Sequence, residues 1–130
     1  MAVALVRGGG ETILVVEDNI ELRRVVVRQL KGFGYQAIEA EGAAVALEVL
    51  RSRKVDLLFT DIVMPGQIDG FELARQAFAL SPTIKVVFTS GFPEAKVNGQ
   101  FGPLAKAVRL LSKPYRKEEL GRTLREVLDG

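Results

Sequence analysis

The sequence predicts an α/β fold in which helices cover both faces of a doubly wound, five-stranded parallel sheet. Short apolar runs rich in β-branched residues alternate strictly with longer segments of helical periodicity, and this alternation is typical of parallel sheets with right-handed crossovers. The length of 130 residues suits one domain, since two cores of about 65 residues each would be marginal.

The first strand is predicted over residues 13–16, where the run Ile-Leu-Val-Val is continuous and apolar, as in a strand buried on both faces. Asp18 or Asn19 can cap the helix that follows. Apolar residues recur in it at spacings near three and four, until Gly32 and Gly34 end it.

The later elements follow from the same two patterns. Further strands are predicted over residues 36–40, 55–60, 85–89 and 108–111. Further helices are predicted over residues 43–51, 71–80 and 116–128. The fourth helix is expected to be short or broken, because two prolines and two glycines lie between Phe92 and Leu104.

Composition excludes several kinds of site. The chain has no Cys, His or Trp, so zinc sites, thiol catalysis, disulfides and His-based acid–base chemistry are excluded. A metal would have to be a hard cation with oxygen ligands. The lack of Cys fits a reducing cytoplasm.

Charge and hydropathy predict neither nucleic-acid nor membrane contact by this domain. The 18 basic and 16 acidic residues leave a net charge of +2, and the basic ones are scattered rather than gathered as in a nucleic-acid binder. No apolar segment approaches the roughly 20 residues needed to span a membrane. Residues 1–11, with three consecutive glycines, are predicted to be a flexible lead-in to a domain over residues 12–130.

Polar side chains follow the predicted strands. The carboxyl ends of parallel strands meet at one edge, and ligands bind outside that edge. The groups expected there are three carboxylates, two hydroxyls and one ammonium, from Glu17, Asp18, Asp61, Thr89, Ser90 and Lys113.

This set of groups suits phosphoryl transfer. Three crowded carboxylates repel one another, and Mg²⁺ bound by carboxylates, waters and phosphate oxygens removes the conflict. Lys113 can neutralise a phosphate oxygen, and Thr89 can donate to it. One carboxylate would act as the nucleophile and form an aspartyl phosphate.

Each of these residues also has a structural interpretation when taken alone. Glu17 and Asp18 could cap a helix, and Asp61 could form a turn. Thr89 could be an ordinary strand residue, and Lys113 an ordinary surface residue. Their ordered occurrence at four strand ends favours the site.

The stretches ILVVEDN, DLLFTDIVMPG with IDGFELA, VVFTSGF and LLSKPY together resemble the receiver domain of two-component response regulators (CheY-like) over residues 12–128. The resemblance implies a flavodoxin-like sheet with strand order 2-1-3-4-5. It also implies that Asp61 accepts a phosphoryl group from a histidine of a sensor kinase or of a histidine phosphotransfer domain.

The resemblance assigns a role to each remaining group. Asp18 is the expected direct Mg²⁺ ligand and Glu17 the neighbouring acid, which often acts through water. Asp61 and the backbone carbonyl of Val63 complete the metal site. The expected phosphoryl contacts come from Thr89, which provides the switch hydroxyl, and from Ser90 and Lys113. The peptide bond between Lys113 and Pro114 is commonly cis in this family.

Three features depart from the family pattern, and none touches the chemical residues. Leu110 stands where the family carries an aromatic switch residue. The segment between Thr89 and Lys113 is slightly longer than in the shortest receivers. The loop at residues 66–68 is slightly longer than the usual turn at this place. We therefore expect switching to be carried by backbone movement after the fourth strand. The expected output or homodimer face comprises the fourth helix, fifth strand and last helix.

Two contexts and three other functions remain open. The departures, with TSGF and LLSKPY, most resemble receivers attached to hybrid sensor histidine kinases, while a single-domain regulator remains open. These contexts would place the chain in the cytoplasmic part of a membrane-bound kinase or in the cytoplasm. The domain would catalyse only its own phosphorylation and dephosphorylation. Loss of the phosphoryl group is expected to be slow to moderate, because Val63 and Gly91 offer no polar group to guide a hydrolytic water. The alternatives are a non-phosphorylated pseudo-receiver scaffold, an aspartyl phosphohydrolase and a flavin- or nucleotide-binding module.

Overall fold

The computed structural model describes residues 9–91 and 101–130. The elements alternate along the chain as the sequence predicts. They are β1 (Thr12–Val16), α1 (Ile20–Gly32), β2 (Gln36–Ala40), α2 (Ala43–Ser52), β3 (Leu57–Asp61), α3 (Gly70–Leu80), β4 (Lys85–Ser90), the 3₁₀ helix η1 (Gly102–Ala107), β5 (Val108–Ser112) and α4 (Lys117–Asp129).

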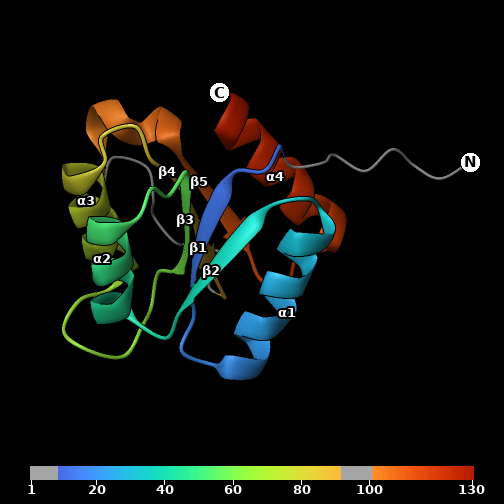
Figure 1. The fold of residues 1–130 in the computed structure, drawn as a ribbon, viewed down its shortest axis with the longest axis horizontal. Coiled ribbons are helices and arrows are strands. Elements are labelled where there is room, and N and C mark those ends of the chain that lie inside the picture. Colours follow the sequence, from blue (N-terminus) through green and yellow to red (C-terminus); the bar gives the residue numbers. More distant parts are fainter. Residues whose placement is uncertain (1–8, 92–100) are drawn as a thin grey trace, which may run out of the picture.

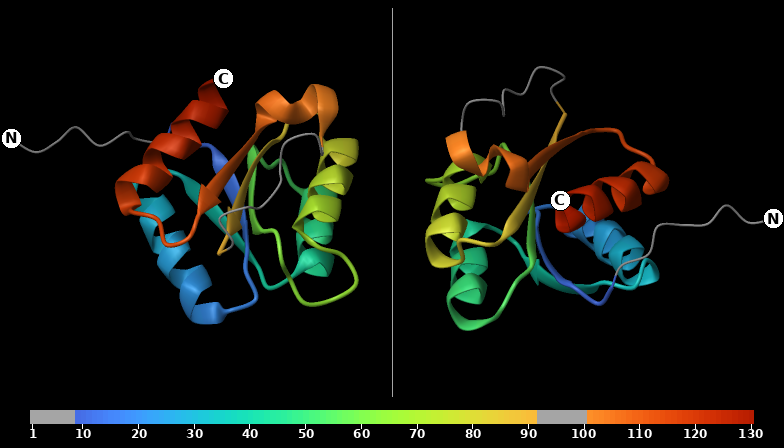
Figure 2. Two further views of the ribbon diagram at one scale, coloured as in Figure 1. Left: turned by 180° about the vertical axis from the view of Figure 1, so that it is seen from behind. Right: turned by 90° about the horizontal axis from the view of Figure 1, so that it is seen from above.

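The five strands form one parallel sheet with the order β2-β1-β3-β4-β5, which confirms the predicted topology. Helices α2 and α3 cover one face of the sheet, and α1 and α4 cover the other (Figures 1 and 2). The carboxyl ends of the strands meet at the lower edge in Figure 1, where the loops leave for α1 and α3. This edge carries the residues predicted to form the site.

Each face of the sheet carries its own apolar core. Leu14 and Val16 of β1 face the α2–α3 layer, whereas Ile13 and Val15 face the α1–α4 layer. All four side chains are at most 1% exposed, as expected for a strand covered on both sides. Burial of one such side chain contributes about 1.5–3 kcal/mol, so the two cores hold the strand ends in place.

Local signals set several element boundaries. Asn19 caps α1, because its side-chain oxygen accepts a hydrogen bond from the Leu22 amide at 3.1 Å. After α1 ends, Gly34 takes a φ of +97°, which glycine adopts readily. The predicted third strand begins later than expected, at Leu57. Asp56 instead uses its side chain to accept a hydrogen bond from the Thr12 amide at 2.8 Å.

The fourth unit follows β4, and the structure describes only part of it. Within the described residues its helical part is the six-residue η1, while residues 92–100 of the expected broken helix lie outside the description. Residues 1–8 of the predicted lead-in lie outside it as well. The last lead-in residue, Glu11, pairs with Arg125 at 2.9 Å.

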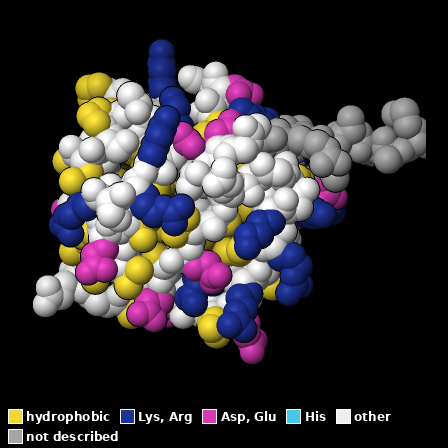
Figure 3. Space-filling view, in the orientation of Figure 1, with side chains coloured by type: hydrophobic (Ala, Val, Ile, Leu, Met, Phe, Trp, Pro, Cys, Tyr) yellow, Lys and Arg dark blue, Asp and Glu magenta, His cyan; other side chains and the backbone are white. Residues whose placement is uncertain are grey.

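The described surface mixes both signs of charge. On the face in Figure 3, Lys and Arg side chains are interspersed with Asp and Glu side chains. None of the described helices combines the length and the apolarity that crossing a membrane requires.

Candidate functional site

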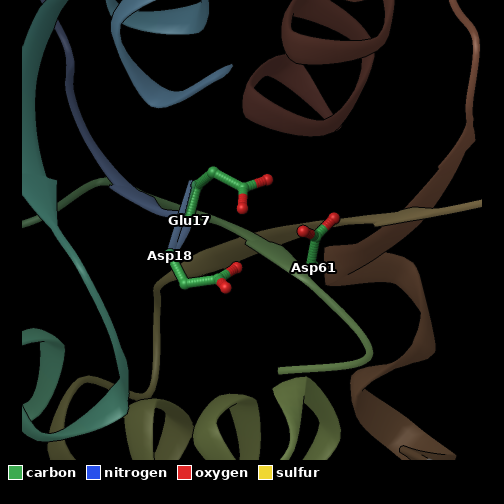
Figure 4. A group of neighbouring side chains, drawn as sticks. All are labelled: Glu17, Asp18 and Asp61. Atoms are coloured by element: carbon green, nitrogen blue, oxygen red, sulfur yellow. The ribbon is translucent and has the colours of Figure 1, made fainter. Parts of the chain in front are cut away.

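Three carboxylates converge at the carboxyl edge of the sheet. Glu17 and Asp18 directly follow β1, and Asp61 ends β3. Figure 4 shows their carboxylates turned toward a shared space. One oxygen from each lies within 4.8 Å of the others. This oxygen-only donor set fits a hard divalent cation such as Mg²⁺.

Asp61 is contacted by two of the predicted partners. It pairs with Thr89 in the β3–β4 register, and the Thr89 hydroxyl donates a hydrogen bond to Asp61 Oδ1. Lys113 Nζ lies 2.6 Å from the same oxygen. A hydroxyl donor and an ammonium group therefore meet at one carboxylate.

Glu17 is the most buried member of the acidic cluster, with 9% of its surface exposed. Its Oε2 accepts a hydrogen bond from the Asn19 amide at 3.0 Å, and its Oε1 lies 3.7 Å from Lys113 Nζ. Burial, assisted by the neighbouring Asp61 and Asp18 carboxylates, raises the pKa of Glu17 to about 7. A cation in the cluster would oppose this shift.

The other predicted residues lie around this cluster. Ser90 ends β4 and is 6% exposed, and its backbone carbonyl accepts a hydrogen bond from the Lys113 amide at 2.7 Å. The Lys113–Pro114 peptide is cis, as the resemblance implies. Val63 lies in the loop after β3 and is 67% exposed.

Gly70 is a residue at the site that the sequence pattern does not single out, because a glycine just before a helix is typical of an ordinary chain break. Its amide donates a hydrogen bond to the Ile62 carbonyl at 2.7 Å. A Cβ at this position would lie 2.1 Å from the Asp61 carbonyl oxygen. Glycine therefore lets the start of α3 pack directly on the backbone that holds Asp61.

Tyr115 is a second residue to which the sequence assigns no role, although it is the last residue of the LLSKPY stretch. It lines a cavity of about 410 Å³ between α1 and the loop after β5, together with Glu17, Thr89 and Lys113. Burial raises the pKa of Tyr115 to about 12, and the Asp61 and Glu17 charges add to the shift. The tyrosine therefore stays neutral beside the acidic cluster.

Many known proteins resemble this chain, and three of the matches illustrate the likeness. Response regulator receiver protein CpdR of Brucella abortus (strain 2308) is 35% identical over 116 residues, which cover 89% of this chain and 95% of CpdR. Sensor kinase CckA of the same strain is 35% identical over 123 residues, which cover 93% of this chain but only 13% of CckA. The crystal structure of the receiver domain from hybrid histidine kinase CckA superposes with a TM-score of 0.75 and 32% identity, covering 90% of this chain and 98% of that domain.

The sequence also matches the response regulator receiver domain family over residues 13–125. This range includes every residue of the acidic cluster, together with Thr89 and Lys113. The strand order agrees with the order that the resemblance implies. The chain therefore belongs to the receiver domain family of two-component response regulators.

Proposed function

We propose that the chain is a phosphoacceptor in a two-component phosphorelay, in which Asp61 accepts a phosphoryl group from a phosphohistidine with the help of Mg²⁺. The observation that carries the proposal is the arrangement around Asp61. Its carboxylate lies within 4.8 Å of two further carboxylates and contacts both the Thr89 hydroxyl and the Lys113 ammonium. These are the groups that charge neutralisation and positioning require in phosphoryl transfer.

In the proposed reaction an Asp61 carboxylate oxygen forms a bond to phosphorus while the phosphorus–nitrogen bond of the donor breaks. The leaving imidazole keeps the electron pair of that bond. Lys113 and Thr89 contact phosphoryl oxygens, and Ser90 adds a further contact. Mg²⁺, held by Glu17, Asp18, Asp61 and the Val63 carbonyl, supplies charge neutralisation to the carboxylates and to a phosphoryl oxygen when bound.

The partner is a histidine kinase or a histidine phosphotransfer domain. In support, α1 presents Ile20, Leu22 and Val25, each 45–51% exposed, beside the cavity that reaches Glu17 and Thr89. An exposed apolar patch of this kind suits docking of another protein. The likenesses to CpdR and CckA leave both a single-domain regulator and a cytoplasmic receiver of a hybrid kinase as contexts for the proposal.

We further infer that phosphorylation biases a two-state arrangement of the backbone after β4. The output surface in this proposal is the face formed by η1, β5 and α4, through which a homodimer could also form. Leu110 lies on β5 at the position of the expected aromatic switch. Its aliphatic side chain supports movement of the backbone rather than of an aromatic rotamer.

Intact mass measurement after incubation with acetyl phosphate tests the proposal. We expect one phosphoryl adduct with Mg²⁺, none with a chelator, and none on Asp61→Asn. The matched control is Asp69→Asn, which changes an exposed α3 cap residue in the same way and keeps a capping side chain. Normal Mg²⁺ binding without an adduct would favour the pseudo-receiver scaffold instead.

A further inference from the structure

Four phenylalanine rings cluster between α3 and the sheet. Phe71 and Phe78 come from α3, Phe88 from β4, and Phe101 directly precedes η1. Phe101 meets the other three, with ring centroids 5.6 Å from Phe88, 5.9 Å from Phe78 and 6.1 Å from Phe71. It is 7% exposed, and the Arg75 guanidinium lies 5.7 Å from its ring centre. Phe101 therefore joins α3, β4 and η1.

The cluster is adjacent to the phosphorylation site along β4. Phe88 immediately precedes Thr89, whose hydroxyl donates to Asp61. Successive side chains of a strand point to opposite faces, so Phe88 enters the ring cluster while Thr89 lies beside the acidic groups. A displacement of the backbone at Thr89 would also move Phe88, because the two residues are neighbours in β4.

The ring that stacks on Phe88 does not come from β5. Leu110 is the cross-strand partner of Phe88, and its aliphatic side chain offers no ring at the position of the family's aromatic switch. Phe101 instead lies against Phe88 with an interplanar angle of 27°. Stacked and edge-on ring pairs attract each other beyond the effect of burial alone, so the contact between Phe88 and Phe101 favours one position of Phe88.

We infer that Phe101 is a positioning residue for Thr89 and transmits the state of Asp61 to η1. This inference rests on the proposed function. Phe101 holds Phe88, and with it Thr89, where the hydroxyl reaches Asp61. When Thr89 follows a phosphoryl group, Phe88 shifts against Phe101. The shift reaches η1 directly, since the Leu104 amide donates a hydrogen bond to the Phe101 carbonyl at 2.9 Å.

Solution NMR of the full chain with Mg²⁺ and beryllofluoride, which mimics a phosphoryl group on a carboxylate, tests the inference. In the wild type we expect the amide signals of Thr89 and of η1 to shift together. In Phe101→Leu the Thr89 signal should still respond, while the shift of the η1 signals should fall by more than half. Phe101→Tyr keeps the ring and should restore the η1 response.

Phe78→Leu is the matched control, because Phe78 meets Phe101 at 5.9 Å but makes no ring contact with Phe88 among the described residues. Urea unfolding should show comparable losses of stability for Phe78→Leu and Phe101→Leu, with the η1 response lost only in the latter. Phe88→Leu removes the other ring of the Phe88–Phe101 pair, so the shift of the η1 signals should be lost in this variant as well.

The outcomes separate this inference from the function on which it rests. A full η1 response in Phe101→Leu, or an equal loss in Phe78→Leu, would overturn the inference alone. A wild type in which Thr89 shifts and η1 does not would also overturn it alone. A wild type with no shift at Thr89 would overturn the proposed function together with it.

Discussion

At Glu17, burial and the carboxylates of Asp61 and Asp18 raise the pKa to about 7, whereas an unperturbed glutamate has a pKa of about 4.3. A carboxyl group must lose its proton to bind a cation. Below the raised pKa, protons therefore compete with Mg²⁺ for Glu17. The stability of the metal-free protein depends on pH in the opposite direction. Its folded state binds the Glu17 proton more tightly than the unfolded state does, because the pKa is raised by folding. The contribution of Glu17 to the free energy of unfolding therefore falls as the pH rises through about 4 to 7.

We expect Mg²⁺ to raise the melting temperature more at about pH 8 than at about pH 6, because metal affinity falls by up to about tenfold per pH unit below the pKa. Differential scanning fluorimetry against metal-free samples at each pH measures this difference. Glu17→Gln should give a smaller shift that is equal at both pH values. Glu21→Gln, an exposed change in the first turn of α1, should behave as the wild type. Equal shifts in the wild type would contradict the role of Glu17.

At the scale of elements, the junction between β3 and α3 sets the position of Asp61. The first residue of α3 has no room for a side chain, since a Cβ on Gly70 would lie 2.1 Å from the Asp61 carbonyl oxygen and 2.9 Å from Ile62 Cα. Both neighbours are backbone atoms, which cannot rotate away. Any larger residue must separate the helix from the strand end.

Gly70→Ala should therefore lower the free energy of unfolding by about 3 kcal/mol, the upper range for overpacking, and slow adduct formation with acetyl phosphate. Urea unfolding and timed intact mass measure the two effects. Gly32→Ala is the matched control, because a Cβ at the end of α1 meets nothing within 4 Å. It should change stability by less than about 1 kcal/mol. A Gly70→Ala protein as stable and reactive as the wild type would refute this account of the junction.

At the scale of the whole molecule, an ion-pair cluster joins the first strand to the last helix. Arg125 of α4 pairs with Glu11, just before β1, at 2.9 Å, and with Asp129 in its own helix. Its guanidinium also lies 3.5 Å from the Tyr35 hydroxyl, just before β2. These contacts lie at the amino ends of the strands, away from the acidic cluster, so they hold the scaffold without touching the chemistry.

Arg125→Gln should lower the free energy of unfolding by about 1 kcal/mol, the upper range for a partly exposed pair, and high salt should shrink the difference. The final extent of phosphorylation should stay unchanged. Arg122→Gln, an exposed change on the same helix, should have no comparable effect. Chemical denaturation at low and high salt distinguishes the two variants, and a salt-independent loss in Arg125→Gln would argue against an ionic cause.

The local sequence pattern was sufficient to predict the order of strands and helices and the residues of the acidic cluster. The apolar run before Glu17 and the Asn19 cap predict their elements because strand burial and helix capping depend on neighbouring residues. Parallel topology then brings Asp61 to the same edge. The role of Gly70 was not predictable in this way, since it depends on how closely a helix approaches a strand. The packing of Phe101 could not be predicted from the sequence either, because its three ring partners are distant in sequence.

Phosphorylation by phosphoramidate, which offers the phosphorus–nitrogen bond of phosphohistidine, tests the central claim most directly. Intact mass followed by peptide mapping would locate the group. The account predicts a single adduct that requires Mg²⁺, maps to Asp61 and is absent from Asp61→Asn. An adduct on another residue, or none in a protein that binds Mg²⁺ normally, would contradict the assignment of Asp61 as the phosphoacceptor.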